Sequence, residues 1–474
     1  MARFMSQARR AEVHRSVLAP REPKRALAFG GGGPAVGISL GFLLALEEWN
    51  SRARDRGRDG CVIEFPVWVA GCVGGWLTCL YHLCDEPRAQ KVEEMIRGFF
   101  RETVMYENFP CPKTFTPDVP AQILEGFKFL IDPRRYPNLV VPDQIARGWR
   151  DMVDFYLTPS RWNRGDFSYM LLNSILAPNP AARLTMTLLY KTPVPGLNTL
   201  WFGEDYSLLK QFDLKKLESP ALPHIYINSY NLDTHRSDIY TNHPQGRPIK
   251  ADPITMPALC ASSALPYILS PVQVGSQTHI EGALVDSFCF EAVHECHADI
   301  NEIWVSRIVD HSQVREPKNL LDALNNLIML YAGTTSRNDI ELFAHHINHE
   351  ELMDCQASRR KADPIEVLQL PVESTTTYLW SYENLDNSLR RSKANCLKFI
   401  EDYCATLDRG QRARLIRQTR TRLGLSQSEF ATRFHVPVGT LRDWEQARAT
   451  APDFAIAYVR VIGQHPEMVA KAVA

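Results

Sequence analysis

Two long uncharged runs, each broken by glycines, constrain the fold of this chain more than any other feature. Residues 26–46 read "ALAFGGGGPAVGISLGFLLAL" and residues 65–84 read "FPVWVAGCVGGWLTCLYHLC". A membrane-spanning helix needs about 20 continuous helix-compatible residues. Central glycines break both runs, and Pro34 follows the four glycines of the first. Each run therefore predicts a buried strand, a glycine turn and a buried helix. The strands are continuously apolar instead of alternating, which favours a parallel sheet covered on both faces and an α/β fold.

The rest of the chain extends this organisation to three parts. Residues 25–408 are predicted to form the α/β domain, with later strands at 224–232 and 301–309 and a mostly helical insertion at about 87–220. Residues 1–24 are basic, lack an apolar segment, and are expected to form an arm and not a secretory signal. Residues 411–474 carry nine Arg and one Lys against five acids, a balance that points to an anionic partner.

Composition narrows the functional classes further. The formal net charge of the whole chain is −1 and favours no partner by itself. Eleven cysteines lie scattered without a CxxC pair, so we expect reduced thiols in the cytoplasm, with peripheral contact to a membrane as an added option. His345 and His349 lie one helical turn apart, but no third ligand is evident and we predict no metal and no cofactor.

The first glycine turn is predicted to bind an anion. A glycine-rich turn before a helix presents backbone N–H groups, which hold either a phosphate or the oxyanion of an acyl-transfer intermediate. Gly31, Gly32 and Gly33 are the candidates. A dinucleotide site would need an acidic residue about 20 positions on, after a second strand, and none is clear. A purely structural turn stays open at this point.

The second turn has the spacing of a nucleophile elbow, in which the residues two before and two after the nucleophile must be small. Cys72 meets this condition with Ala70 and Gly74. Val73 meets it too, with glycines on both sides, but valine is β-branched, costly at positive φ, and offers no nucleophile. Cys72 is therefore the preferred occupant, and the helix N-terminus is expected to stabilise its thiolate. The alternative is one more buried cysteine.

A nucleophile needs a base, and two acids follow the apolar stretch "ALCASSALPYILSPV". Glu281 ends a predicted strand before a glycine turn, from which a carboxylate could reach a facing elbow. Asp286 lies five residues further on and is the second candidate. Either could instead be a solvated turn acid.

Together these segments resemble the patatin-like phospholipase family over about residues 25–310. "ALAFGGGGPAVGISLGFLLALEE" is similar to its oxyanion-hole segment, and "VAGCVGGW" aligns with its "GTSAGA" elbow with Cys72 over the serine. "CASSALPYILSPV" resembles the block before its catalytic aspartate, and "EGA" stands where the family has "DGG" or "DGA". The resemblance implies a three-layer sandwich with a mainly parallel sheet, and a dyad without histidine that cleaves lipid or other hydrophobic acyl esters.

The departures from that pattern leave two functions open. Serine is replaced by Cys72, aspartate by Glu281, and the family's Arg–Gly after the glycines by Ala35 and Val36. The first function is an acyl hydrolase in which Cys72 attacks and Glu281 takes its proton. The rival is a catalytically inactive relative that senses a lipid and reports to DNA.

The C-terminal module has sequence features that predict DNA binding. Ser426 and Glu429 form a capping box, "HVP" is a turn, and Leu441 and Trp444 mark the inner face of a following helix. The stretch resembles helix-turn-helix domains of the phage-repressor and antitoxin type over about 412–468. That implies DNA contacts from Gln427, Thr440 and Arg442 and a homodimer, because one copy per chain binds weakly. A bundle that only dimerises is the alternative.

Overall fold

Both glycine-rich turns fold as strand–turn–helix units in the computed structural model. The structure describes residues 23–31, 33–56, 61–102, 142–163, 165–168, 213–244, 249–266, 271–297, 299–307, 309–317, 320–358, 365–372 and 382–473, with 124, 127, 128, 131, 132, 134 and 170. Gly32, nearly all of the predicted arm at 1–24 and much of the predicted insertion at 87–220 lie outside these residues. The predicted α/β fold with a mainly parallel sheet is confirmed.

The central sheet is mixed and mainly parallel. Its strands are β1 (Arg25–Phe29), β2 (Val67–Ala70), β3 (His224–Asn231), β4 (Arg236–Thr241), β5 (Ala251–Pro253), β6 (Val272–Val274), β7 (Gln277–Glu281), β8 (Glu302–Ser306) and β9 (Glu366–Gln369). They run in the order β5-β4-β3-β2-β1-β8-β9, with β7 paired to both β3 and β6. The neighbours from β3 to β9 pair in parallel, whereas β4 and β7 are antiparallel to β3.

Helices cover the sheet and connect its strands. In the α/β part they are α2 (Gly37–Asp55), α3 (Val73–Leu83), α4 (Arg88–Glu102), α7 (Pro142–Leu157), α11 (Met256–Ser262), α12 (Phe290–Cys296) and α13 (Leu320–Ser358). Short 3-10 helices are η1 (Gly33–Val36), η5 (Pro159–Arg161), η6 (Leu214–Glu218), η7 (Gly282–Leu284) and η8 (His311–Gln313). None of the helices that the structure describes is long and apolar enough to cross a membrane.

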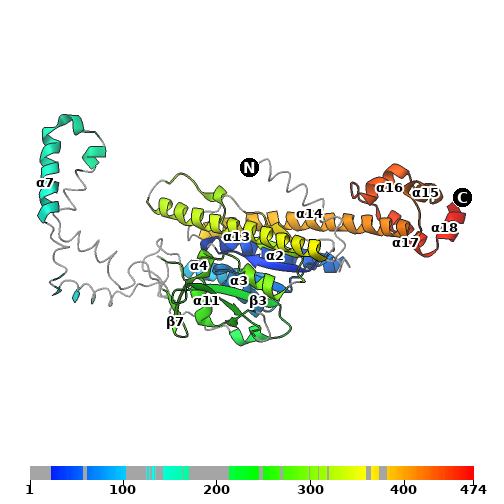
Figure 1. The fold of residues 1–474 in the computed structure, drawn as a ribbon, viewed down its shortest axis with the longest axis horizontal. Helices are drawn as coiled ribbons and strands as arrows, with labels where there is room; N and C mark the ends of the chain where they lie inside the picture. The colour runs from blue at the N-terminus through cyan, green and yellow to red at the C-terminus, as the bar shows by residue number, and fades with distance from the viewer. Residues whose placement is uncertain are drawn as a thin grey trace.

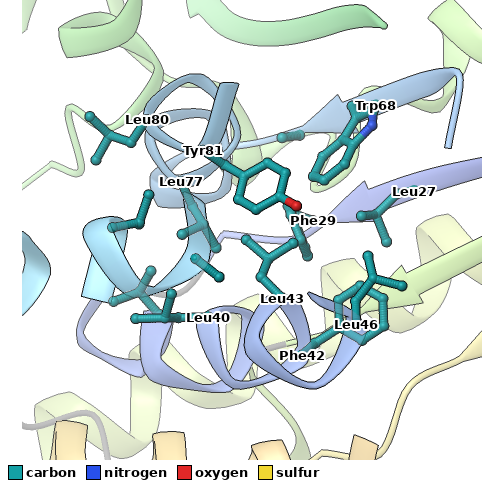
Figure 2. Packing of buried hydrophobic residues seen from close by; sticks show 14 of the residues in the cluster. Leu27, Phe29, Leu40, Phe42, Leu43, Leu46, Trp68, Leu77, Leu80 and Tyr81 are labelled. Carbon is teal, nitrogen blue, oxygen red and sulfur yellow. The ribbon is translucent and has the colours of Figure 1, made fainter. Parts of the chain in front are cut away.

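Two hydrophobic layers sandwich the sheet, as the continuously apolar strands predict. Leu27 and Phe29 of β1 point into the layer made with α2, α3 and α14, where Figure 2 shows them beside Phe42 and Tyr81. The alternate residues Ala26 and Ala28 belong to the second layer, made with α12 and α13. Strand β1 ends just before the first glycine turn and strand β2 just before the second. Both turns therefore lie at the edge of the sheet formed by the carboxyl ends of these strands.

The helix α14 (Tyr382–Arg422) continues for 14 residues past position 408, where the α/β domain is predicted to end. It packs along α2 at one end and against α16 and α17 at the other (Figure 1). The helices that follow it are α15 (Gln427–Arg433), α16 (Val438–Glu445), α17 (Asp453–Gln464) and α18 (Pro466–Val473). The expected boundary at 408–411 therefore falls inside a continuous helix and not in a linker.

Glycines in α2 allow α14 to approach it closely. A Cβ on Gly41 would lie 2.7 Å from the backbone oxygen of Leu389 and 2.8 Å from the backbone nitrogen of Lys393. A Cβ on Gly37 would meet the Ser388 hydroxyl. Ser392 fixes the contact by donating its hydroxyl to the Ile38 carbonyl at 2.6 Å.

We predict that Gly41→Ala destabilises the protein by about 1–3 kcal/mol, because the added methyl group meets backbone that cannot rotate away. Gly98→Ala is the matched control, since Gly98 also lies within a helix and has no atom within 4 Å of its Cβ position. That control should be neutral or stabilising by up to about 1 kcal/mol. Urea unfolding of both variants measures the difference, and equal stabilities would contradict the close packing of α2 and α14.

Candidate functional site

Cys72 occupies a strained turn between β2 and α3. Its backbone has φ 49° and ψ −129°, a conformation that residues with side chains rarely adopt, whereas Val73 begins the helix without a positive φ. The neighbours leave no room for larger residues: a Cβ on Gly71 would lie 2.5 Å from the Ser287 carbonyl oxygen, and one on Gly74 would lie 2.8 Å from the Phe29 oxygen. The strain therefore falls on the cysteine, as expected for the elbow register that places Cys72 at its tip.

The sheet register brings Glu281 to the same place. Ala70, the last residue of β2, pairs with Ile227 of β3, and Glu281 of β7 pairs with Ser229, two residues further along β3. Strand β7 thus takes the position beside β3 just beyond the end of β2. Because Cys72 follows Ala70 by two residues, it reaches the level at which Glu281 ends its strand.

Gly31 completes the meeting of three segments. A Cβ on Gly31 would lie 2.8 Å from Cys72 Cβ, 3.3 Å from Glu281 Oε1 and 2.7 Å from Ala283 Cβ. Gly33 has φ 49°, and it starts η1, which leads directly into α2. Among the three predicted anion-binding glycines, Gly31 lies at the dyad and Gly33 starts the next turn, while Gly32 is outside the described residues.

The two candidate catalytic side chains are buried and hydrogen-bonded to each other. Cys72 is 4% exposed and Glu281 is 5% exposed. Burial raises the pKa of Glu281 to about 7, while a hydrogen bond from the Cys72 thiol acts in the opposite direction. The Oε2 atom of Glu281 has no hydrogen-bond partner among the described residues. The carboxyl group is therefore poised to exchange a proton near neutral pH.

Asp286, the second candidate base, has a different task. Its Oδ1 accepts the backbone N–H groups of Phe288 at 3.2 Å and Cys289 at 2.9 Å, and so shapes the turn before α12. Burial, reinforced by the nearby Asp339, raises its pKa to about 6. These two backbone donors hold Asp286 in the turn before α12, and Glu281 is the acid that is hydrogen-bonded to Cys72.

Sequence reasoning missed the polar residues of β3 that hold this turn. Asn228 donates its side-chain amide to the Asp286 carbonyl at 2.8 Å, and its backbone packs against Gly282, where a Cβ would lie 2.8 Å from it. Asn228 and Ser229 are both fully buried. The signal was present in "HIYINSYNL", because adjacent polar residues in the middle of an apolar strand are costly without a partner.

The C-terminal helices form a second candidate site. Ser426 and Glu429 make the predicted capping box, and Phe430 and Phe434 fill the core of the bundle. On α16, Arg442 is exposed and Thr440 is partly exposed, in line with the expected groove contacts. The helix α16 thus presents a polar outer face.

Gln427 has a structural partner in this bundle. Its amide donates to Glu445 Oε2 at 2.6 Å, and Arg420 holds the same carboxylate through Nε at 2.6 Å and a second nitrogen at 3.1 Å. Glu445 is 1% exposed, so this network ties α14, α15 and α16 together. The sequence did not reveal it, because a buried acid and a solvated one look alike in a single chain.

The two histidines considered as a metal pair, His345 and His349, lie on α13. His345 and His349 stack with ring centroids 6.1 Å apart. Among the residues that the structure describes, no group of three histidine, cysteine or acidic residues is arranged to hold a metal ion.

Comparisons with known proteins match two families to separate parts of the chain. A family model described as patatin-like phospholipase matches residues 27–294, and one described as helix-turn-helix matches residues 416–468. No curated protein matches the chain in sequence. One similar solved structure is that of VipD from Legionella pneumophila, at 12% identity, covering 96% of this chain and 86% of that chain with a TM-score of 0.32. That score is too low to inform the site.

We predict that Glu281→Gln makes the protein more stable at alkaline pH. The folded pKa of about 7 lies above the ordinary 4.5, so folding favours the protonated carboxyl and stability falls as pH rises from about 4.5 through 7. The variant should exceed the wild type by on the order of 2–3 kcal/mol above about pH 8 and by little below about pH 4. Denaturant unfolding at each pH tests this, and a pH-independent difference would contradict the raised pKa.

Proposed function

The chain belongs to the patatin-like phospholipase family, and from that premise we propose that it is a lipid acyl hydrolase with Cys72 as nucleophile and Glu281 as base. The observation that carries the proposal is the pairing of a strained, buried cysteine with a buried carboxyl that accepts its thiol hydrogen. Nucleophile and base within hydrogen-bond reach are the signature of covalent acyl transfer. The substrate class, a lipid or other hydrophobic acyl ester, is inferred from the family.

The reaction then follows from the two side chains. Glu281 takes the thiol proton as the Cys72 sulfur attacks the acyl carbonyl carbon, and backbone N–H groups of Gly31 to Gly33 stabilise the oxyanion. The ester C–O bond breaks, the alcohol leaves with the proton from Glu281, and a thioester remains on Cys72. Glu281 then removes a proton from water, which attacks the thioester and releases the carboxylic acid and the free thiol.

We predict that Cys72→Ala lowers kcat for a chromogenic medium-chain ester by about a thousandfold or more, because the covalent step is lost. Glu281→Gln should cost on the order of 10²–10⁴-fold. Wild-type turnover should rise through about pH 7 as Glu281 ionises.

Cys72→Ser is the matched variant for this experiment, since it keeps a nucleophile and removes the thiol. It should retain turnover and become insensitive to iodoacetamide, which should inactivate the wild type. If the wild type, Cys72→Ala and Cys72→Ser are all inert, the hydrolase proposal fails and the lipid-sensing regulator becomes the better account.

A second candidate function is DNA binding by residues 416–468. It is favoured by the match to the helix-turn-helix family and by Arg442, which α16 presents to solvent. A regulator of this kind would act as a homodimer on two half-sites. In an inactive relative, the same module would report the presence of a bound lipid.

We predict that Arg442→Ala weakens binding to duplex DNA and lowers the slope of log K against log salt by about 1, if Arg442 contacts a phosphate. Arg460→Ala is the control, because Arg460 is equally exposed but lies on α17. Titration of labelled DNA at several salt concentrations measures both. A wild type that binds no DNA at low salt but sediments as a dimer would support the dimerisation alternative instead.

A further inference from the structure

The helix α7 lies in the predicted insertion and has an apolar face that is open to solvent. Its exposed apolar residues fall at helical spacing and are Trp149 (56%), Val153 (52%), Tyr156 (60%) and Leu157 (76%). Successive positions three or four apart lie on one face of a helix. Arg147, Arg150, Asp151 and Asp154 occupy the other side.

This face is not simply the inner side of a local fold. Phe155 of α7 is buried and packs against Trp162 and Phe167 at ring distances of 6.4 and 6.1 Å. Trp162 also donates its indole N–H to the Phe155 carbonyl at 2.9 Å. Trp162 and Phe167 therefore lie on the Phe155 side, and among the residues that the structure describes Trp149 and Val153 stay more than half exposed.

We propose that this face of α7 docks on a lipid surface. The inference rests on the proposed function, because it supplies the partner from which a lipid acyl hydrolase would draw its substrate. An amphipathic helix with low overall hydrophobicity and exposed Trp and Tyr is the type that lies in the plane of a membrane interface. Trp and Tyr are suited to that layer because each has an apolar body and one polar group.

A second apolar surface, at the active-site turn, favours a lipid over a protein partner. Tyr331 of α13 donates its hydroxyl to the Leu284 carbonyl at 2.8 Å, three residues after Glu281. Tyr331, Leu327 and Val285 expose about half or more of their surface there. An apolar surface beside the turn that carries Glu281 is expected if the substrate arrives from a lipid layer.

The net charge of the α7 segment indicates which lipid headgroup is sufficient for docking. Residues 142–168 contain four arginines and four aspartates, and so carry no net charge. Docking through α7 should therefore depend on apolar burial and not on anionic headgroups. Vesicles of pure phosphatidylcholine are the appropriate probe, and salt should change their binding little.

The experiment is flotation of the full chain with phosphatidylcholine vesicles. The wild type and Cys72→Ala should bind equally, because docking does not need chemistry. Val153→Asp should lower the partition coefficient by about tenfold or more, since it places a charge in the buried face. Arg150→Gln is the matched control: it makes the charge of the same helix more negative by the same amount on the polar side, and should stay within about twofold of the wild type.

Activity assays separate docking from catalysis. Val153→Asp should hydrolyse a water-soluble ester at the wild-type rate but vesicle phospholipid more slowly. The docking proposal is overturned if the wild type does not bind vesicles, or if Val153→Asp binds them equally well. It is also overturned if Val153→Asp hydrolyses the soluble ester faster than the wild type, because α7 would then cover this chain's own site. If the wild type hydrolyses the soluble ester but does not bind vesicles, the docking proposal fails and the hydrolase proposal stands. If it binds vesicles but hydrolyses neither substrate, the hydrolase proposal fails and the docking proposal stands.

Discussion

The close approach of backbone at Gly31 is the constraint on which the candidate site depends. Three segments that are distant in sequence meet there, since a Cβ on Gly31 would lie within 3.3 Å of atoms from Cys72, Glu281 and Ala283. Gly31, within the glycine run that interrupts the first apolar stretch, is needed for this reason. Any side chain at Gly31 would separate the oxyanion loop from the thiol, and about 1 Å of displacement can cost on the order of 100-fold in rate.

The same loop is tied to the C-terminal module through one helix. The turn leads by way of η1 into α2, whose Gly37 and Gly41 receive α14. Helix α14 is fixed at its centre by Tyr403, which donates to Glu302 at 2.7 Å, and it ends with Arg420 on the buried Glu445 of α16. Because α14 is continuous, the α/β part and the C-terminal helices share one helix. A flexible linker would instead let them move independently.

Sequence reasoning predicted the fold and nominated the candidate site residues because their signals are local. Glycine spacing and the poor fit of a β-branched valine at positive φ separated Cys72 from Val73 in advance. Glu281 and Asp286 could not be separated, because the difference is which carboxylate accepts backbone N–H groups, and that depends on the loop geometry. The role of Gln427 was missed for a related reason: it depends on Glu445, whose burial is a property of the assembled bundle.

Cys72 and Glu281 stand where the resemblance places the family's serine and aspartate, and both residues carry an energetic cost in this fold. Gly71 and Gly74 would be retained in any case, because larger residues would collide with backbone. Cys72 and Glu281 have no such protection. A side chain at positive φ costs on the order of 1–3 kcal/mol, and a buried carboxyl with an unpartnered oxygen costs a similar amount. Glycine at 72 would relieve the first cost, and an apolar side chain at 281 would relieve the second, so the proposed chemistry gives a physical reason for a thiol and a carboxyl at these positions.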